Sequence, residues 1–303
     1  MIAALLASVI TAATPLLLAA LGELVVERAG VLNLGVEGMM LVGAVAAFAA
    51  TSVTGSPALG ILAAAVAGAA MGGLFAALTL GLASNQVATG LALTIFGIGL
   101  SALLGAGFVG HPLPPLPKLD LPFFEQLPLL RQDALVYLSL AATAVVAWFL
   151  RRTRAGLILR AVGESDGSAH ALGHDVLRIR AAAVLFGGAM AGLAGADLSL
   201  AYTPMWVEDM TAGRGWIALA LVVFSAWQPW RLLLGAYLFG GITILQLYAQ
   251  GSGFSAVPTQ FLAMLPYLAT ILVLTMISPG ISSAKARRFG APACLGKPFR
   301  PAS

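Results

Sequence analysis

Long apolar runs dominate this chain, and polar residues gather in the short stretches between them. A helix needs about 20 apolar residues to cross the hydrocarbon core of a bilayer. The runs reach that length without the alternating polarity of membrane β-barrel strands. We therefore predict an all-α, polytopic transmembrane helical bundle. About nine spans are expected (eight to ten), at residues 1–22, 38–54, 58–83, 88–110, 134–150, 181–204, 213–228, 231–250 and 260–278.

Two segments predict broken or re-entrant helices. Gly215–Trp230 contains only 16 uncharged residues, which is about 24 Å of helix against a hydrocarbon core of about 30 Å. It follows a charged, glycine-containing stretch at 206–216. The second irregular segment is Asn33–Gly38, between the first two runs. Irregular backbone at membrane depth is tolerated only inside protein or beside a water-filled path, and in transporters it often lines the substrate site.

The basic residues set the expected orientation. Six arginines lie between Arg151 and Arg180, and five basic residues lie between Lys285 and Arg300. Because Lys and Arg in short loops favour the cytoplasmic side, we predict a cytoplasmic loop at 151–180 and a cytoplasmic basic tail at 279–303, after a membrane domain at 1–278. Alternation then places the loop 111–133 outside.

Composition excludes several classes of protein. Apolar residues make up 60% of the 303 positions and charged residues 9%. This composition is too apolar for a soluble enzyme, a secreted disulfide scaffold or a disordered chain. The single cysteine, Cys294, excludes an internal disulfide. The basic clusters border apolar runs without interleaved aromatic residues, so the net charge of +4 does not indicate nucleic-acid binding.

Small residues at helical spacing predict close helix packing. Three groups have small-xxx-small spacing, which lets backbones approach within lipid: Gly68/Gly72, Gly97/Ser101/Gly105 and Gly188/Gly192. Gating hinges are the alternative interpretation. In the loop 111–133, six prolines predict an extended surface segment, which either docks an external partner through Phe123 and Phe124 or only connects two spans.

The loop 151–180 contains a predicted short helix. Ser165 or Asp166 can cap its start, and Gly173 can end it in the left-handed conformation. Ala169 and Leu172 share one face at i, i+3. This helix either docks into a groove on another protein or is a capped turn of an ordinary solvated loop.

Several chemical motifs are missing from the sequence. It has no G-x-x-x-x-G-K-[ST] phosphate loop and no G-x-S-x-G elbow, so we expect no ATP hydrolysis, catalytic residues or cofactor in this chain. His170 and His174 have a spacing that can chelate zinc, but Gly173 between them favours a solvated helix end, and no metal site is predicted.

Four collinear stretches, at Leu21–Ala44, Asn85–Leu93, Arg160–Gly173 and Met210–Ala220, resemble bacterial ABC-importer permeases for nucleosides and simple sugars. The chain is most similar to the shorter of two paired nucleoside permeases. The resemblance implies a heterodimeric pore in the cytoplasmic (inner) membrane, a separate cytoplasmic ATPase that holds ATP and Mg, and an extracytoplasmic solute-binding lipoprotein.

The resemblance also implies roles for particular residues. The coupling helix that seats in the ATPase would correspond to Gly163, Glu164, Ser165, Ala169, Leu172 and Gly173. That stretch departs from the usual pattern, which has Asn-Pro after the glutamate and then an alanine pair. Asp197 is a second departure, because the family usually has an uncharged residue there.

Polar residues at the irregular segments, in the matched stretches and inside the span 181–204 are candidates for the translocation path: Asn33, Glu37, Asn85, Gln86, Asp197 and Arg214. Asp197 either lies on the path near Arg214 or reaches outer water. Glu37 either lines the path or sits favourably at the N-terminal end of a helix dipole.

Two other classes of protein remain as alternatives. An ion-gradient-driven secondary transporter would favour several acidic residues inside spans, where the sequence analysis places only Asp197. A membrane enzyme acting on a lipid-borne substrate would need a catalytic constellation that the sequence lacks. Within the ABC class, permeases for ribose or branched-chain amino acids are alternatives for the solute.

Overall fold

The computed structural model describes residues 2–119, 130–251 and 290–299, together with seven single positions between 261 and 275. Over these residues the chain is helical, with only three isolated β-bridges, which confirms the all-α prediction. In chain order the helices are α1 (Ile2–Arg28), α2 (Val36–Thr54), α3 (Pro57–Ala76), the π-helical η1 (Ala77–Gly81), α4 (Gln86–Gly105), the 3-10 turn η2 (Ala106–Phe108), α5 (Ala134–Arg152), α6 (Arg154–Glu164), α7 (Asp166–Ala171), α8 (Val176–Ala196), the π-helical η4 (Asp197–Tyr202), α9 (Arg214–Phe224) and α10 (Pro229–Gly251).

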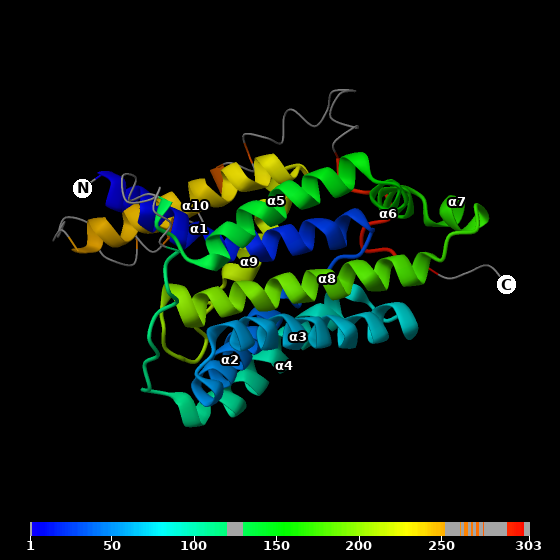
Figure 1. Cartoon of the computed structure of the whole chain (residues 1–303). Coiled ribbons are helices and arrows are strands. Elements are labelled where there is room, and N and C mark those ends of the chain that lie inside the picture. The colour runs from blue at the N-terminus through cyan, green and yellow to red at the C-terminus, as the bar shows by residue number, and fades with distance from the viewer. Residues whose placement is uncertain are drawn as a thin grey trace.

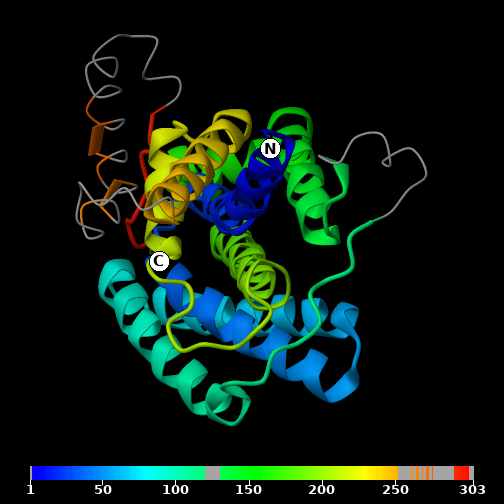
Figure 2. The same ribbon diagram turned by 90° about the vertical axis from the view of Figure 1, so that its left-hand side faces the viewer.

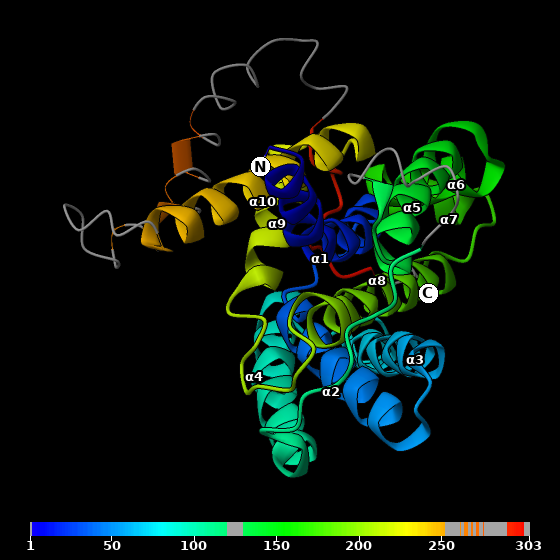
Figure 3. The same cartoon turned by 60° about the vertical axis from the view of Figure 1, so that its left-hand side comes forward.

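Seven helices of the described part are long and apolar enough to cross a membrane. These are α1, α2, α3 with η1, α4, α5, α8 with η4, and α10. The predicted short run is also found, as the 11-residue helix α9, which lies against α1, α2 and α10 (Figure 3). The ninth predicted run, 260–278, lies outside the described residues apart from single positions, so a count of nine stays a prediction.

The first helix is longer than predicted. The sequence places the end of the first span at residue 22 and a connection at 23–37, because Glu23 is the first charge. This prediction is wrong: α1 continues to Arg28 with Glu23 and Glu27 each 1% exposed. Both carboxylates accept hydrogen bonds inside the protein, so their charge does not require the helix to end there.

Polar side chains define where several helices begin. Asn85, Asp133, Thr153, Ser165 and Asp175 each accept a hydrogen bond from a backbone N–H in the first turn that follows. These caps satisfy donors that have no partner within the helix. The starts of α4 to α8 are therefore encoded locally.

Helix α8 lies in the middle of the bundle, with α2, α3 and α4 on one side and α1, α5 and α10 on the other (Figure 2). Its glycines make the closest approaches: a side chain on Gly188 or Gly192 would meet the backbone of α3, at Gly68 and Ala64. Gly97 approaches Gly38 of α2 in the same way. The predicted packing role of the small residues is confirmed, including Gly72 against Val184, Gly105 against Trp206, and the buried Ser101.

The two ends of the bundle differ. At one end lie the N-terminus and the segment after α4, which runs extended beside residues 200–206 through Leu113 N–H to Pro204 O and Leu116 N–H to Leu200 O (Figure 1). This confirms the extended conformation for 111–119, whereas Phe123 and Phe124 lie outside the described residues. At the opposite end, the α7 end, lie α6, α7 and the segment 290–299 (Figure 1).

Candidate functional site

The connection between α1 and α2 folds back along α1. The Asn33 N–H donates to Glu23 Oε1 at 3.1 Å, and Asn33 Oδ1 accepts from the Gly35 N–H at 2.9 Å. The neighbouring Leu32 N–H donates to Gln86 Oε1 at 2.8 Å, which ties the connection to the start of α4. Asn33 is fully buried. The irregular backbone predicted at Asn33–Gly38 therefore lies inside the protein, where its polar groups find partners.

Glu37 holds the start of the short helix α9. One of its oxygens, Oε1, accepts from Thr211 Oγ1 at 2.5 Å and from the Gly213 N–H at 2.8 Å. The other, Oε2, accepts from the Gly215 N–H at 2.5 Å. The carboxylate is 3% exposed and lies where the α9 dipole is positive. Of its two predicted roles, the structure shows the helix-dipole one, but at α9 as well as at its own helix.

Glycine is needed at both backbone positions, 213 and 215, that donate to Glu37. Gly213 has φ +81°, a left-handed conformation that places its N–H toward Glu37. A Cβ on Gly215 would lie 2.6 Å from Glu37 Oε2. Gly213 and Gly215 thus let a buried carboxylate accept hydrogen bonds from backbone N–H groups at the start of α9.

Asp197 lies near Arg214, the first residue of α9. Asp197 begins η4 at 0% exposure, and neither of its oxygens has a hydrogen-bond partner among the described residues. The charged residues near enough to act on it electrostatically are Asp133 and Arg214. Arg214 lies 5.2 Å from the ring centroid of Tyr202, in a cation–π contact, and donates to Met210 O at 3.1 Å. The alternative that Asp197 reaches outer water is wrong, because the protein encloses its side chain.

The remaining two pathway candidates lie elsewhere, at the start of α4. Asn85 is exposed, and its Oδ1 accepts from the Ala88 N–H as the helix cap. Gln86 is 3% exposed, and its Nε2 has no hydrogen-bond partner within the described ranges of the chain. The six candidates therefore form two groups: Asn33, Asn85 and Gln86 around the α1–α2 connection, and Glu37, Asp197 and Arg214 around the break before α9.

More acidic side chains are buried inside the helices than the single one, Asp197, that the sequence predicts. Glu23, Glu27 and Glu37 are buried in α1 and α2, in addition to Asp197. The argument that a single internal acid disfavours a secondary transporter is therefore wrong. Glu27 and Glu37 are engaged with Trp227 and with α9, which gives them structural roles.

The short helix in the loop 151–180 is confirmed, as α7. Ser165, rather than Asp166, is its cap, and Gly173 ends it at φ +86°. Ala169 is 2% exposed and packs with Val162 and Val176, whereas Leu172 is 78% exposed. The two residues predicted to share a face therefore do different things: one anchors the helix, and the other projects into the surroundings.

Arg180 connects α7 to α1 and to the segment 290–299. Its side chain is fully buried and donates to Ala29 O at 3.1 Å, to Asp166 Oδ2 at 3.1 Å and to Lys297 O at 3.4 Å. One guanidinium thus bridges the end of α1, the start of α7 and the segment 290–299. Sequence analysis missed this role, and the available signal was an arginine at the edge of the long apolar run of α8.

The segment 290–299 belongs to the predicted tail 279–303 and packs against the same elements. Cys294 N–H donates to Gly163 O at 2.9 Å, and Gly296 N–H donates to Gly30 O at 3.3 Å. Phe299 lies edge-on to His170, with ring centroids 5.5 Å apart. Gly163 itself approaches the Arg28 backbone so closely that a Cβ would clash.

No group of three or more His, Cys, Asp or Glu side chains that could hold a metal ion occurs among the described residues.

A second set of hydrogen bonds at the α7 end joins α1 to the α9–α10 connection. Trp227 Nε1 donates to Glu27 Oε2 at 2.6 Å, and Arg28 donates to Trp227 O at 3.1 Å.

The family model described as the permease component of branched-chain amino acid transport systems matches residues 5–276. The chain belongs to this permease family. It is a membrane permease subunit of an ABC importer, a transport component rather than a catalyst. Seven helices in the part of the chain that the structure describes are long and apolar enough to cross a membrane, so the chain is a multi-pass membrane protein.

Curated relatives agree along nearly the whole chain. The permease is 45% identical to the putative glucose ABC transporter permease protein TsgC13 of Haloferax volcanii, over 90% of this chain and 91% of that protein. It is 32% identical to the nucleoside ABC transporter permease protein NupC of Lactococcus lactis, over 90% and 91%. It is 31% identical to the guanosine ABC transporter permease protein NupQ of Bacillus subtilis, over 94% of each.

Two of these organisms also contain a second matching permease. They are TsgB13 in H. volcanii, 28% identical, and NupP in B. subtilis, 27% identical. No solved structure matches the chain.

Proposed function

We propose that this permease pairs with a second permease in the cytoplasmic membrane and moves a sugar or nucleoside inward, driven by a separate ATPase at the α7 end. The observation that carries the proposal is the geometry of α7. Its exposed Leu172 projects from a short helix that Ala169 and Arg180 hold firmly against the bundle.

An anchored helix with a projecting apolar side chain suits docking into a groove of another protein. Movement of that protein reaches the bundle only if α7 is joined to it rigidly. Arg180 supplies the joint, because it bonds α7 to the end of α1 and to the segment 290–299. In this proposal ATP and Mg bind to the partner ATPase, and the permease itself holds no cofactor.

The names of the relatives support the proposed solute and the second permease. TsgC13 and TsgB13 are named for glucose, and NupQ and NupP for guanosine, so matching permeases occur two to an organism. We infer that this permease forms a similar heterodimer, with an extracytoplasmic solute-binding lipoprotein as its donor. A branched-chain amino acid, suggested by the family description, is the second candidate solute.

Asp197 and Arg214 are the proposed solute contacts. A buried carboxylate without a donor is costly, and hydroxyl groups of a sugar or ribose are donors that would satisfy it during passage. Uptake of radiolabelled glucose, guanosine and leucine should fall at least tenfold for the transported solute in Asp197→Asn. Normal uptake with normal assembly would remove Asp197 from the path.

Cross-linking tests the docking proposal. In a Cys294→Ser background, Leu172→Cys should form a cross-link to the ATPase chain in inside-out membranes. The matched control is Val207→Cys, which is 46% exposed and lies on the segment before α9. Labelling of Leu172→Cys in intact cells by a membrane-impermeant maleimide, with no ATPase cross-link, would contradict both the docking and the orientation.

A further inference from the structure

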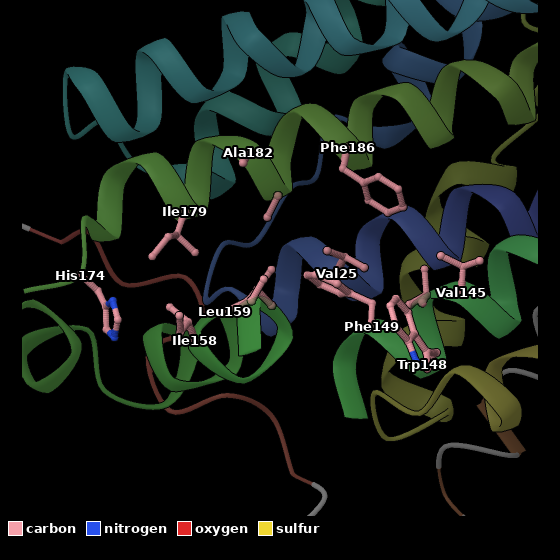
Figure 4. A pocket seen from close by; sticks show the side chains of 13 residues that line it. Val25, Val145, Trp148, Phe149, Ile158, Leu159, His174, Ile179, Ala182 and Phe186 are labelled. Carbon is pink, nitrogen blue, oxygen red and sulfur yellow. The ribbon is translucent and has the colours of Figure 1, made fainter. Parts of the chain in front are cut away.

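An apolar groove lies on the side of the bundle between α5 and α8. Its volume is about 520 Å³, within the range of small-molecule pockets, about 300–1,000 Å³. The floor comes from α1, and α6 closes the α7 end (Figure 4). Side chains that define it include Val25, Phe149, Leu159, Ile179, Ala183 and Phe186.

The lining does not suit the solute of the permease. Nearly every side chain around the groove is hydrocarbon, and the polar exceptions are His174 and the indole nitrogen of Trp148. A sugar or nucleoside needs several hydrogen-bonding groups that this lining lacks. The groove is also open along its side, because Val145 is 59% exposed and Trp148 is 61% exposed. Because α5 and α8 are both long and apolar enough to cross a membrane, an opening between them lies at the depth of the acyl chains.

Positive charge lies beside the groove at one point of the chain. Side chains between Val145 and Phe149 line it from α5, and side chains between Ala155 and Leu159 line it from α6. The stretch that joins these two sets contains Arg151, Arg152 and Arg154. All three are exposed. Thr153 caps the start of α6 at the same corner, where the helix dipole is positive. Apolar walls with a cationic corner at one end match a lipid that has an anionic headgroup.

We propose that the groove binds one acyl chain of an anionic phospholipid, with its phosphate held by the Arg151–Arg154 corner. The small side chains of Ala182 and Ala183 leave room for the chain against α8, and α6 lies across its path at the α7 end. A lipid bound there fills the space between α6 and α8, the two helices that flank α7. Binding depends only on the permease spanning a membrane. In the orientation proposed above, the α7 end faces the cytoplasm, which places this lipid in the cytoplasmic leaflet. Only that choice of leaflet rests on the proposed orientation.

The test uses the assembled importer in nanodiscs that contain a phosphatidylglycerol with a diazirine near the end of one acyl chain. After illumination, mass spectrometry should find the label mainly on peptides covering 145–159 and 179–186. The same diazirine on phosphatidylcholine, whose phosphate charge is balanced by its own choline cation, should label these peptides at least about fivefold less, the factor expected when one arginine attracts a headgroup of net negative charge. Replacing Arg151, Arg152 and Arg154 together by Gln should make the two lipids label equally.

Filling the groove supplies the second arm. Ala182→Trp places an indole in the groove and should reduce the labelling at least fivefold, and Val145→Trp is the independent filling variant. The control is Ala70→Trp, an exposed alanine of α3 away from the groove. Each variant is first checked for assembly with the ATPase. Labelling spread evenly over α3, α4 and the groove, labelling unchanged by both tryptophans, or labelling found on the second permease in place of this groove would each overturn the proposal. ATPase docking is unaffected by any of these results, so the two proposals fail separately.

Discussion

Replacing Glu37 by Gln tests how the start of the short helix α9 is held. The carboxylate accepts three hydrogen bonds from Thr211, Gly213 and Gly215. Glutamine keeps one acceptor oxygen but turns an NH₂ group toward the Gly215 N–H, so one buried donor loses its acceptor, at about 1–3 kcal/mol. The other two bonds lose their charge assistance, which adds about 1 kcal/mol. We expect local destabilisation of the α9 start by about 2–4 kcal/mol.

Hydrogen exchange measures this effect directly. A loss of about 2–4 kcal/mol corresponds to a fall in amide protection of about 30- to 1,000-fold. The Gly213 and Gly215 amides should show it in mass spectra of the purified permease, while amides in the middle of α8 stay protected. Glu208→Gln, on an exposed side chain of the same segment, is the matched control. Protection in Glu37→Gln within threefold of the parent protein would refute the clamp.

Three further substitutions test other contacts. Arg180→Gln removes the hydrogen bonds that connect α7 to α1 and to the segment 290–299. It should lower solute uptake at least tenfold and raise proteolytic cleavage within 290–299. Unchanged uptake would contradict the proposal that Arg180 couples α7 to the bundle. Gly192→Leu drives a side chain into the α3 backbone, so the permease should not be recovered as a folded chain by gel filtration. Trp227→Phe leaves buried Glu27 without its donor and should lower stability by about 1–3 kcal/mol in thermal unfolding. Trp230→Phe, at a residue 48% exposed, should change it little, and equal effects would count against the Trp227 bond.

The helical class and most helix positions could be predicted because membrane helices are encoded in local composition. Runs of apolar residues and caps such as Asn85, Ser165 and Asp175 sit close in sequence to the helices they define. The short helix α9 and the packing glycines were also predictable. Their cause is local too: a short uncharged run in one case and small residues one turn apart in the other.

The polar contacts could not be predicted, because they join segments far apart in sequence. Glu23 and Glu27 look like the end of a membrane span until Asn33 and Trp227 are seen to bond them. Arg180 looks like one more positive loop residue, yet its partners come from α1, α7 and the segment 290–299. A charged side chain can be buried only where it finds partners, and the sequence does not show which distant segments folding brings beside it.

Transport in proteoliposomes tests the central claim most directly. The permease, its partner permease and the ATPase would be reconstituted with ATP on the ATPase side, with proton and sodium gradients collapsed by ionophores. Solute delivered by its binding protein should be taken up, and this uptake should be abolished by omitting the ATPase or ATP and unaffected by the ionophores. Uptake by this permease without the ATPase, or uptake that stops when the gradients collapse, would contradict the central claim.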